Sequence, residues 1–149
     1  MEDPCITSPA LKWKKHLGSQ SSPLGRVGLG ASEIPFFFFA GDTGYSKDFI
    51  DLGNKFEGFD LAATQIGGYS PRWFMKQKHI NPEEAVKIHQ DIDSRYSVAI
   101  HWGTFMLTDE PVDEPPKLLE DALAQKGIYK EHFFVMQHGE TRSLQFLLR

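Results

Sequence analysis

Four apolar runs alternate with segments that carry helix signals, and this alternation constrains the fold more than any other feature of the chain. The runs are PFFFFAGDTG over 35–44, FDLAATQIGG over 59–68, SVAIHWGTF over 97–105 and HFFVMQHGE over 132–140. Short continuous apolar runs of this kind are typical of strands buried on both faces, as in a parallel sheet. Strands that alternate with helices in this order indicate an α/β layer protein.

Each of the three intervening segments has its own helix signal. Ser46 is placed to cap a helix whose apolar stripe contains Phe49, Leu52, Gly53 and Phe56. Asn81, Pro82 and Glu84 form an N-x-x-E capping box at the start of the second helix. A third helix is predicted from about Lys117 to a stop at Gly127.

Residues 1–34 are different in character. They contain the tract GSQSSPLGRVGLGAS and have no sustained apolar period. We interpret them as a flexible or unrelated N-terminal tail, with a folded domain over 35–149.

The composition of the chain excludes several classes of protein. No uncharged stretch approaches the roughly 20 apolar residues that a membrane-spanning helix needs, and the N-terminus does not read as a secretory signal. A cytoplasmic or membrane-surface location is therefore expected. The net charge of −4 gives no basic stripe for nucleic acid. With Cys5 as the one cysteine, a metal would be held by histidine and carboxylate.

Two of the predicted strands end in side chains that bind metals. Asp42 follows the first run between glycines, and His101 ends the third. Ligands of open α/β sheets bind beyond the carboxyl ends of the strands, and zinc accepts both donor types. An Asx-type turn at Asp42 and a buried structural histidine are the alternative. An aspartic protease is disfavoured, because it needs two such acids in an all-β architecture and this chain has one Asp-Thr-Gly followed by a helix.

The segment 69–78 fits no period and is predicted as a loop. His79 follows it and could act as a general acid or donate to an oxyanion, or it could be a solvated loop histidine. The loop mixes aromatic and apolar side chains with cations: Tyr69, Trp73, Phe74 and Met75 with Arg72, Lys76 and Lys78. Two interpretations are open. The loop faces lipid headgroups or phosphate, or its aromatic side chains pack beneath it.

Together, FFFAGDTGY, FDLAATQIGGYSPRWFM, HINPEEAV, AIHWGTF and FFVMQHGETR resemble N-acyl-phosphatidylethanolamine-hydrolysing phospholipase D of the metallo-β-lactamase superfamily, over roughly residues 36–143. The resemblance implies an αββα sandwich with two zinc ions that activate a hydroxide against a phospholipid phosphodiester. Phosphatidic acid and an N-acylethanolamine would be released. By this resemblance Asp42 is a catalytic carboxylate that bridges the metals, His101 is a zinc ligand, and His79 is catalytic, assisting the leaving group or the phosphoryl oxygens.

The family's His-x-His-x-Asp-His signature is absent from the chain, and Gly68 and Ser70 stand where alanine and glutamate are expected. We therefore expect the second half of the sandwich, an incomplete fold. The prediction is a zinc-dependent phosphodiesterase that acts on a phospholipid at a peripheral membrane surface. The alternative is an inactive truncated fragment that keeps the lipid-facing loop. A homodimer is left open.

Overall fold

A computed structural model describes residues 35–143 of the chain. The predicted tail, residues 1–34, lies outside the described residues, so the domain boundary remains a prediction. None of the helices within 35–143 has the length and apolar character needed to cross a bilayer.

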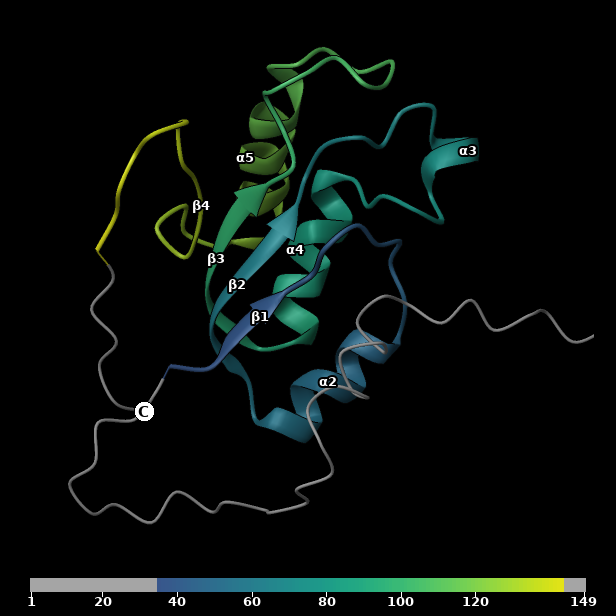
Figure 1. Cartoon of the computed structure of the whole chain (residues 1–149). Coiled ribbons are helices and arrows are strands. Elements are labelled where there is room, and N and C mark those ends of the chain that lie inside the picture. The colour runs from purple at the N-terminus through teal and green to yellow at the C-terminus, as the bar shows by residue number, and fades with distance from the viewer. Residues whose placement is uncertain (1–34, 144–149) are drawn as a thin grey trace, which may run out of the picture.

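A single parallel sheet organises the described residues (Figure 1). Its strands, in both chain order and spatial order, are β1 (Phe37–Phe39), β2 (Phe59–Gln65), β3 (Ser94–Ile100) and β4 (Phe133–Val135). All three pairings are parallel, for example Phe39 with Ala63 and Ala63 with Val98. The predicted α/β class with a parallel sheet is confirmed. The carboxyl ends of the strands consequently meet at one edge of the sheet.

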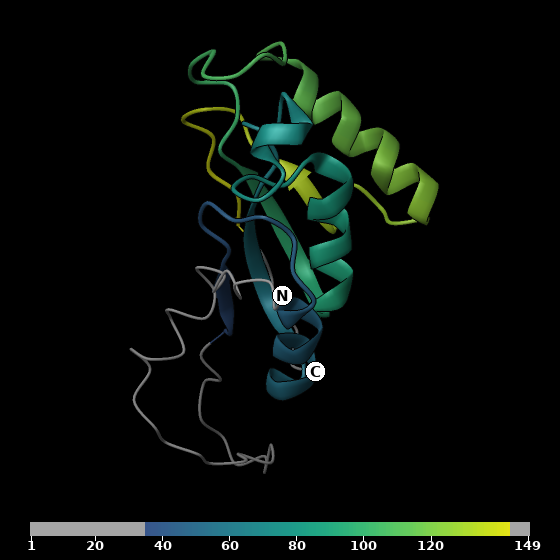
Figure 2. The same cartoon turned by 90° about the vertical axis from the view of Figure 1, so that its right-hand side faces the viewer.

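The longer helices lie on one side of this sheet, as Figure 2 shows. They are α2 (Asp48–Phe56), α4 (Pro82–Asp91) and α5 (Glu114–Lys126). The core lies between these helices and the inner face of the sheet, and includes Phe38, Phe49, Phe59, Ile66, Ile88, Ile92, Leu119 and Phe133. A sheet with helices on one side corresponds to two of the four layers of an αββα sandwich.

The opposite face of the sheet carries no helix among the residues that the structure describes. In β1, Phe38 is 9% exposed, whereas Phe37 and Phe39 are 56% and 48% exposed. The expectation that this strand is buried on both faces is therefore wrong. The pleat directs Phe38 toward the helices and its two neighbours toward the open face.

The capping signal is confirmed for α4 but not for α2, whose N-cap is Lys47 and not the predicted Ser46; Ser46 Oγ accepts a hydrogen bond from the Asp48 N–H. Asn81 accepts a hydrogen bond from the Glu84 backbone N–H, and the Glu84 side chain accepts one from the Asn81 backbone, which confirms the capping box of α4. Helix α5 begins at Glu114, before the predicted Lys117, because prolines in a first turn forfeit no intrahelical hydrogen bond.

One short element was missed. The segment predicted as a loop contains α3 (Arg72–Met75), a single turn in which the Pro71 carbonyl accepts from the N–H groups of Phe74 and Met75. Four residues are too few to establish an apolar period.

Candidate metal centre

Asp42, His79 and His101 converge at the carboxyl edge of the sheet. Each offers one ligand atom, and the three atoms lie within 4.8 Å of one another. His101 Nε2 is 3.4 Å from Asp42 Oδ1, and the centroids of the two imidazole rings are 5.0 Å apart. The structure thus brings together all the site residues that the sequence nominated.

Three separate pieces of backbone deliver these side chains. Gly41, with φ of 64°, turns the chain after β1 and places Asp42 beyond the strand. His101 itself has φ of 59°, a left-handed conformation that non-glycine residues adopt rarely and that is often found at functional sites. His79 precedes α4, and its carbonyl accepts a hydrogen bond from the guanidinium of Arg72 at 2.8 Å.

The end of β2 supports both histidines. His101 Nδ1 is 3.2 Å from the carbonyl oxygen of Gly67, and His79 Nδ1 is 3.2 Å from Oε1 of Gln65. A carbonyl oxygen only accepts hydrogen bonds, so Nδ1 of His101 carries the proton and Nε2 faces Asp42 with a lone pair when the ring is neutral. Metal-binding histidines are usually held in this way, by donation from the second ring nitrogen to a carbonyl or carboxylate.

This donor set fits a divalent cation such as zinc. Two imidazoles and a carboxylate are ligands that zinc accepts. Asp42 is 68% exposed and His101 30% exposed at their side chains, so the cluster is open to solvent and to ligands. The other described histidines, His89, His132 and His138, lie outside this cluster, and His89 is buried.

Burial favours the uncharged form of His79. Loss of hydration lowers its pKa below the usual value, and the nearby His101 lowers the pKa further. A neutral imidazole retains a lone pair that can accept a proton or a cation.

Gly68 packs directly against both imidazoles. A Cβ at this position would lie 3.1 Å from Cε1 of His101 and 3.5 Å from Cγ of His79, and the backbone has φ of 83°. At Gly67 a Cβ would collide with the carbonyl oxygen of His101. Gly67 is therefore required for the close approach of this segment to His101, whereas a methyl group at Gly68 would need the imidazole to shift by a few tenths of an ångström.

Glu110 anchors the same loop and was missed by the sequence analysis. Its carboxylate accepts hydrogen bonds from the backbone N–H groups of Gly68, Tyr69 and Ser70. Burial acts to raise the pKa of Glu110. Hydrogen bonds from the Thr108 side chain and from backbone N–H groups outweigh that effect, so the pKa is lowered. The carboxylate stays ionised and fixes the backbone that supports the imidazoles. No local motif indicates this role, because the partners lie about forty residues apart along the chain.

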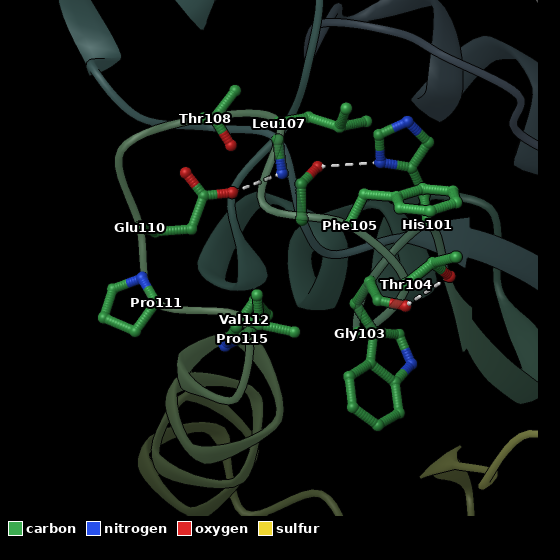
Figure 3. Close-up of a pocket in the computed structure, with 13 residues that line it drawn as sticks. His101, Gly103, Thr104, Phe105, Leu107, Thr108, Glu110, Pro111, Val112 and Pro115 are labelled. Carbon is green, nitrogen blue, oxygen red and sulfur yellow. Dashed lines mark hydrogen bonds between the residues drawn. The ribbon is translucent and has the colours of Figure 1, made fainter.

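A cavity of about 120 Å³ adjoins the cluster (Figure 3). Glu110 and His101 stand on its two sides, each hydrogen-bonded to the backbone of the Gly67–Gly68 segment. The rest of the lining is largely apolar and includes Phe105, Leu107, Pro111, Val112 and Pro115. This arrangement gives the cluster an apolar pocket next to its polar groups.

Comparison with known proteins identifies the family of this chain. The pattern of the beta-lactamase superfamily domain matches residues 25–102, which is more than half of the chain. The chain belongs to the beta-lactamase superfamily. The family resemblance and the fold class expected from the sequence are thereby confirmed.

Individual members of the superfamily are similar over most of the chain. It is 46% identical over 101 residues to the N-acyl-phosphatidylethanolamine-hydrolyzing phospholipase D 1 of Caenorhabditis elegans, covering 66% of this chain and 28% of that protein. It is 42% identical over 109 residues to the mitochondrial N-acyl-phosphatidylethanolamine-hydrolyzing phospholipase D of Saccharomyces cerevisiae, covering 72% and 23%. The chain thus spans about a quarter of the length of these superfamily members.

A solved member of the same fold gives the structural counterpart. Igni18, a metallo hydrolase from the archaeon Ignicoccus hospitalis, superposes with a TM-score of 0.51 at 22% identity, over 74% of this chain and 42% of that one. This likeness establishes the metallo-β-lactamase-like fold of the superfamily.

Proposed function

We propose that this chain carries part of the active site of a metal-dependent phosphodiesterase that hydrolyses N-acylated phosphatidylethanolamine. The convergence of Asp42, His79 and His101 within 4.8 Å is the observation that carries the proposal. The similarity to two N-acyl-phosphatidylethanolamine-hydrolyzing phospholipases supports the substrate class. Hydrolysis adds water to phosphorus and breaks its bond to the N-acylethanolamine oxygen, giving phosphatidic acid and an N-acylethanolamine.

Asp42 and His101 are the residues that we assign to hold the cation, and zinc suits their carboxylate and imidazole donors. A bound zinc ion, or a pair of them, would lower the pKa of water and stabilise charge on the attacking and leaving oxygens. His79, whose pKa is lowered by burial, is assigned to proton transfer. It can accept a proton from the attacking water and return it to the leaving oxygen.

The exposed side chains around the site suit a lipid substrate. Trp73 and Phe74 on α3 are 87% and 55% exposed, so they do not pack beneath the loop. Lys76 and Lys78 are exposed beside them, and Lys78 Nζ lies 5.4 Å from the centre of the Phe74 ring. Aromatic groups next to cations favour the headgroup region of an anionic bilayer. We propose that α3 contacts the phospholipid surface from which the substrate is drawn.

A non-catalytic protein is the second candidate. Among residues 35–143 only three donor side chains gather, whereas a tetrahedral zinc site takes four ligands. On this alternative the chain retains the lipid-facing α3 and the cation-binding residues without turnover.

One experiment separates the two candidates. Purified chain is incubated with N-acyl-phosphatidylethanolamine vesicles, with zinc or with a chelator, and N-acylethanolamine is measured by mass spectrometry. Zinc-dependent product that disappears in Asp42→Asn supports the phosphodiesterase. Zinc binding without product supports the non-catalytic protein, and the absence of zinc binding refutes both assignments of the metal centre.

A further inference from the structure

Gln65 is a fully buried polar residue that connects His79 to the backbone of Thr43, the residue after Asp42. It ends β2 and is 0% exposed. Its side-chain Nε2 donates to the carbonyl oxygen of Thr43 at 2.7 Å, and its Oε1 lies 3.2 Å from Nδ1 of His79. One carboxamide therefore links the turn that carries Asp42 to the imidazole of His79.

These two contacts determine where the proton of His79 lies. The backbone carbonyl oxygen of Thr43 can only accept a hydrogen bond, so the Gln65 atom that faces it must be the amide nitrogen. The atom that faces His79 is then the amide oxygen, which also only accepts. Nδ1 of His79 must therefore carry a hydrogen, and Nε2 of the neutral ring is left with a bare lone pair.

We propose that Gln65 is a positioning residue that holds His79 in its Nδ1–H tautomer and so leaves Nε2 as the acceptor of the site. This proposal rests on the proposed function for the use made of Nε2, namely acceptance of a proton from water. The tautomer itself depends only on the contacts of Gln65. Partners of this kind typically contribute about 10- to 100-fold to activity or metal affinity, and a loss of that size in kcat is expected for Gln65→Leu in any assembly that turns over.

The tautomer can be measured without metal or substrate. The full chain is labelled with ¹⁵N-histidine, and long-range ¹H–¹⁵N spectra are recorded at about pH 8, above the ordinary histidine pKa of ~6.5. Protonated and bare ring nitrogens differ widely in ¹⁵N shift, and His79→Gln assigns the signals. We expect a protonated Nδ1 and a bare Nε2 at His79, with a shift toward the Nε2–H form in Gln65→Leu.

Two further variants complete the test. Gln65→Glu retains an acceptor for Nδ1 and should preserve the tautomer, although it cannot donate to Thr43. Gln77→Leu alters an exposed glutamine close to His79 and should leave the signals unchanged. A proton on Nε2 in the wild-type chain overturns the proposal, as does an unchanged tautomer in Gln65→Leu. If the leucine variant does not fold, the wild-type and glutamate spectra still decide.

This outcome is independent of the proposed function. A chain that fails to bind zinc or to hydrolyse lipid refutes the phosphodiesterase but leaves the Nδ1–H signal in place. A chain that hydrolyses lipid with Nε2–H at His79 refutes the role of Gln65 alone.

Discussion

At the residue scale, Gly68 sets how closely the backbone approaches the two imidazoles. Its backbone has φ of 83°, and a Cβ in place of one of its α-hydrogens would point at His79 and His101. The chain contains a glycine with almost the same φ and open space around it, Gly139, with φ of 84°. This pair separates backbone strain from crowding of the site.

We predict that Gly68→Ala changes zinc affinity by less than about 10-fold relative to Gly139→Ala, because a contact of 3.1 Å is relieved by a shift of a few tenths of an ångström in the imidazole and alanine is the residue that the family resemblance predicts at this position. Both Gly68→Ala and Gly139→Ala should lose about 1–2 kcal/mol of unfolding free energy from the left-handed backbone. Isothermal titration with zinc and urea denaturation measure the two effects. A loss of zinc affinity well beyond 10-fold in Gly68→Ala alone would contradict this prediction.

His89 makes stability depend on pH. It is 6% exposed, and its Nδ1 lies 2.8 Å from Oγ of Ser97. Burial lowers its pKa to about 4, and the nearby His132 acts in the same direction. Because the folded-state pKa is below the ordinary 6.5, the contribution of neutral His89 is complete above pH 6.5 and is lost as the pH falls toward 4.

We predict a fall of up to about 3 kcal/mol in unfolding free energy across that window from this residue. His89→Gln should flatten the fall, since glutamine does not titrate. His138→Gln, at an exposed position, should retain it. Urea denaturation at intervals from pH 7 to 4 provides the measurement, and the same slope in all three proteins would refute the assignment to His89.

Asp42 and His101 could be nominated from the ends of two apolar runs, whereas the role of His79 came from the family resemblance. Asp42 and His101 follow the strands β1 and β3, and parallel strands bring their carboxyl ends to one edge. Gln65 and Glu110 could not be found in this way. Their importance comes from contacts with residues 14 to 42 positions away, and a single sequence records no such pairing.

At the scale of elements, α4 depends on its N-terminal cap. Asn81 and Glu84 satisfy each other's backbone N–H groups, and Glu84 also forms an ion pair with Arg72 at 2.8 Å. The cap therefore fixes both the start of the helix and the segment that carries His79. It was predictable because it involves only four consecutive residues, whereas α3 has too little periodic sequence to be recognised.

We predict that Asn81→Ala lowers the unfolding free energy by about 1 kcal/mol, the usual cost of removing a helix cap. Asn54→Ala, at an exposed position inside α2, should be neutral or slightly stabilising because alanine is the better helix former. Equilibrium denaturation of the two variants supplies the comparison. A similar loss in both would show that the cap is not the cause.

Adjacent phenylalanines in β1 face opposite environments. Phe38 contacts Phe49 and Phe59 in the core, and Phe39 is half exposed on the open face. We expect Phe38→Ala to cost about 3–5 kcal/mol and Phe39→Ala about 1 kcal/mol or less. Thermal and urea unfolding distinguish them, and equal losses would mean that the open face is covered in solution.

At the scale of the whole molecule, the metal centre joins segments that the fold must first bring together. Asp42 follows β1, His79 precedes α4 and His101 follows β3. An unfolded chain does not hold these donors within reach of one ion. Cation binding should therefore favour the folded state.

We predict that zinc at 100 times its dissociation constant raises the unfolding free energy by about 2.7 kcal/mol. A chelator should reverse the rise. Asp42→Asn, which lacks the carboxylate, should show little of it. The transition temperature in differential scanning calorimetry reports the change, and an equal rise in the asparagine variant would place the binding elsewhere in the chain.

The outer strands of the sheet have a consequence for how copies of this chain could associate. Both β1 and β4 are three residues long, so each rim presents few backbone groups to an incoming strand. The broad side of the sheet, with Phe37 and Phe39, presents much more apolar area. If two copies associate, we expect their sheets to pack face to face through this apolar surface. Such packing gives small closed assemblies, whereas pairing through the edge strands would give fibrils that lengthen strand by strand.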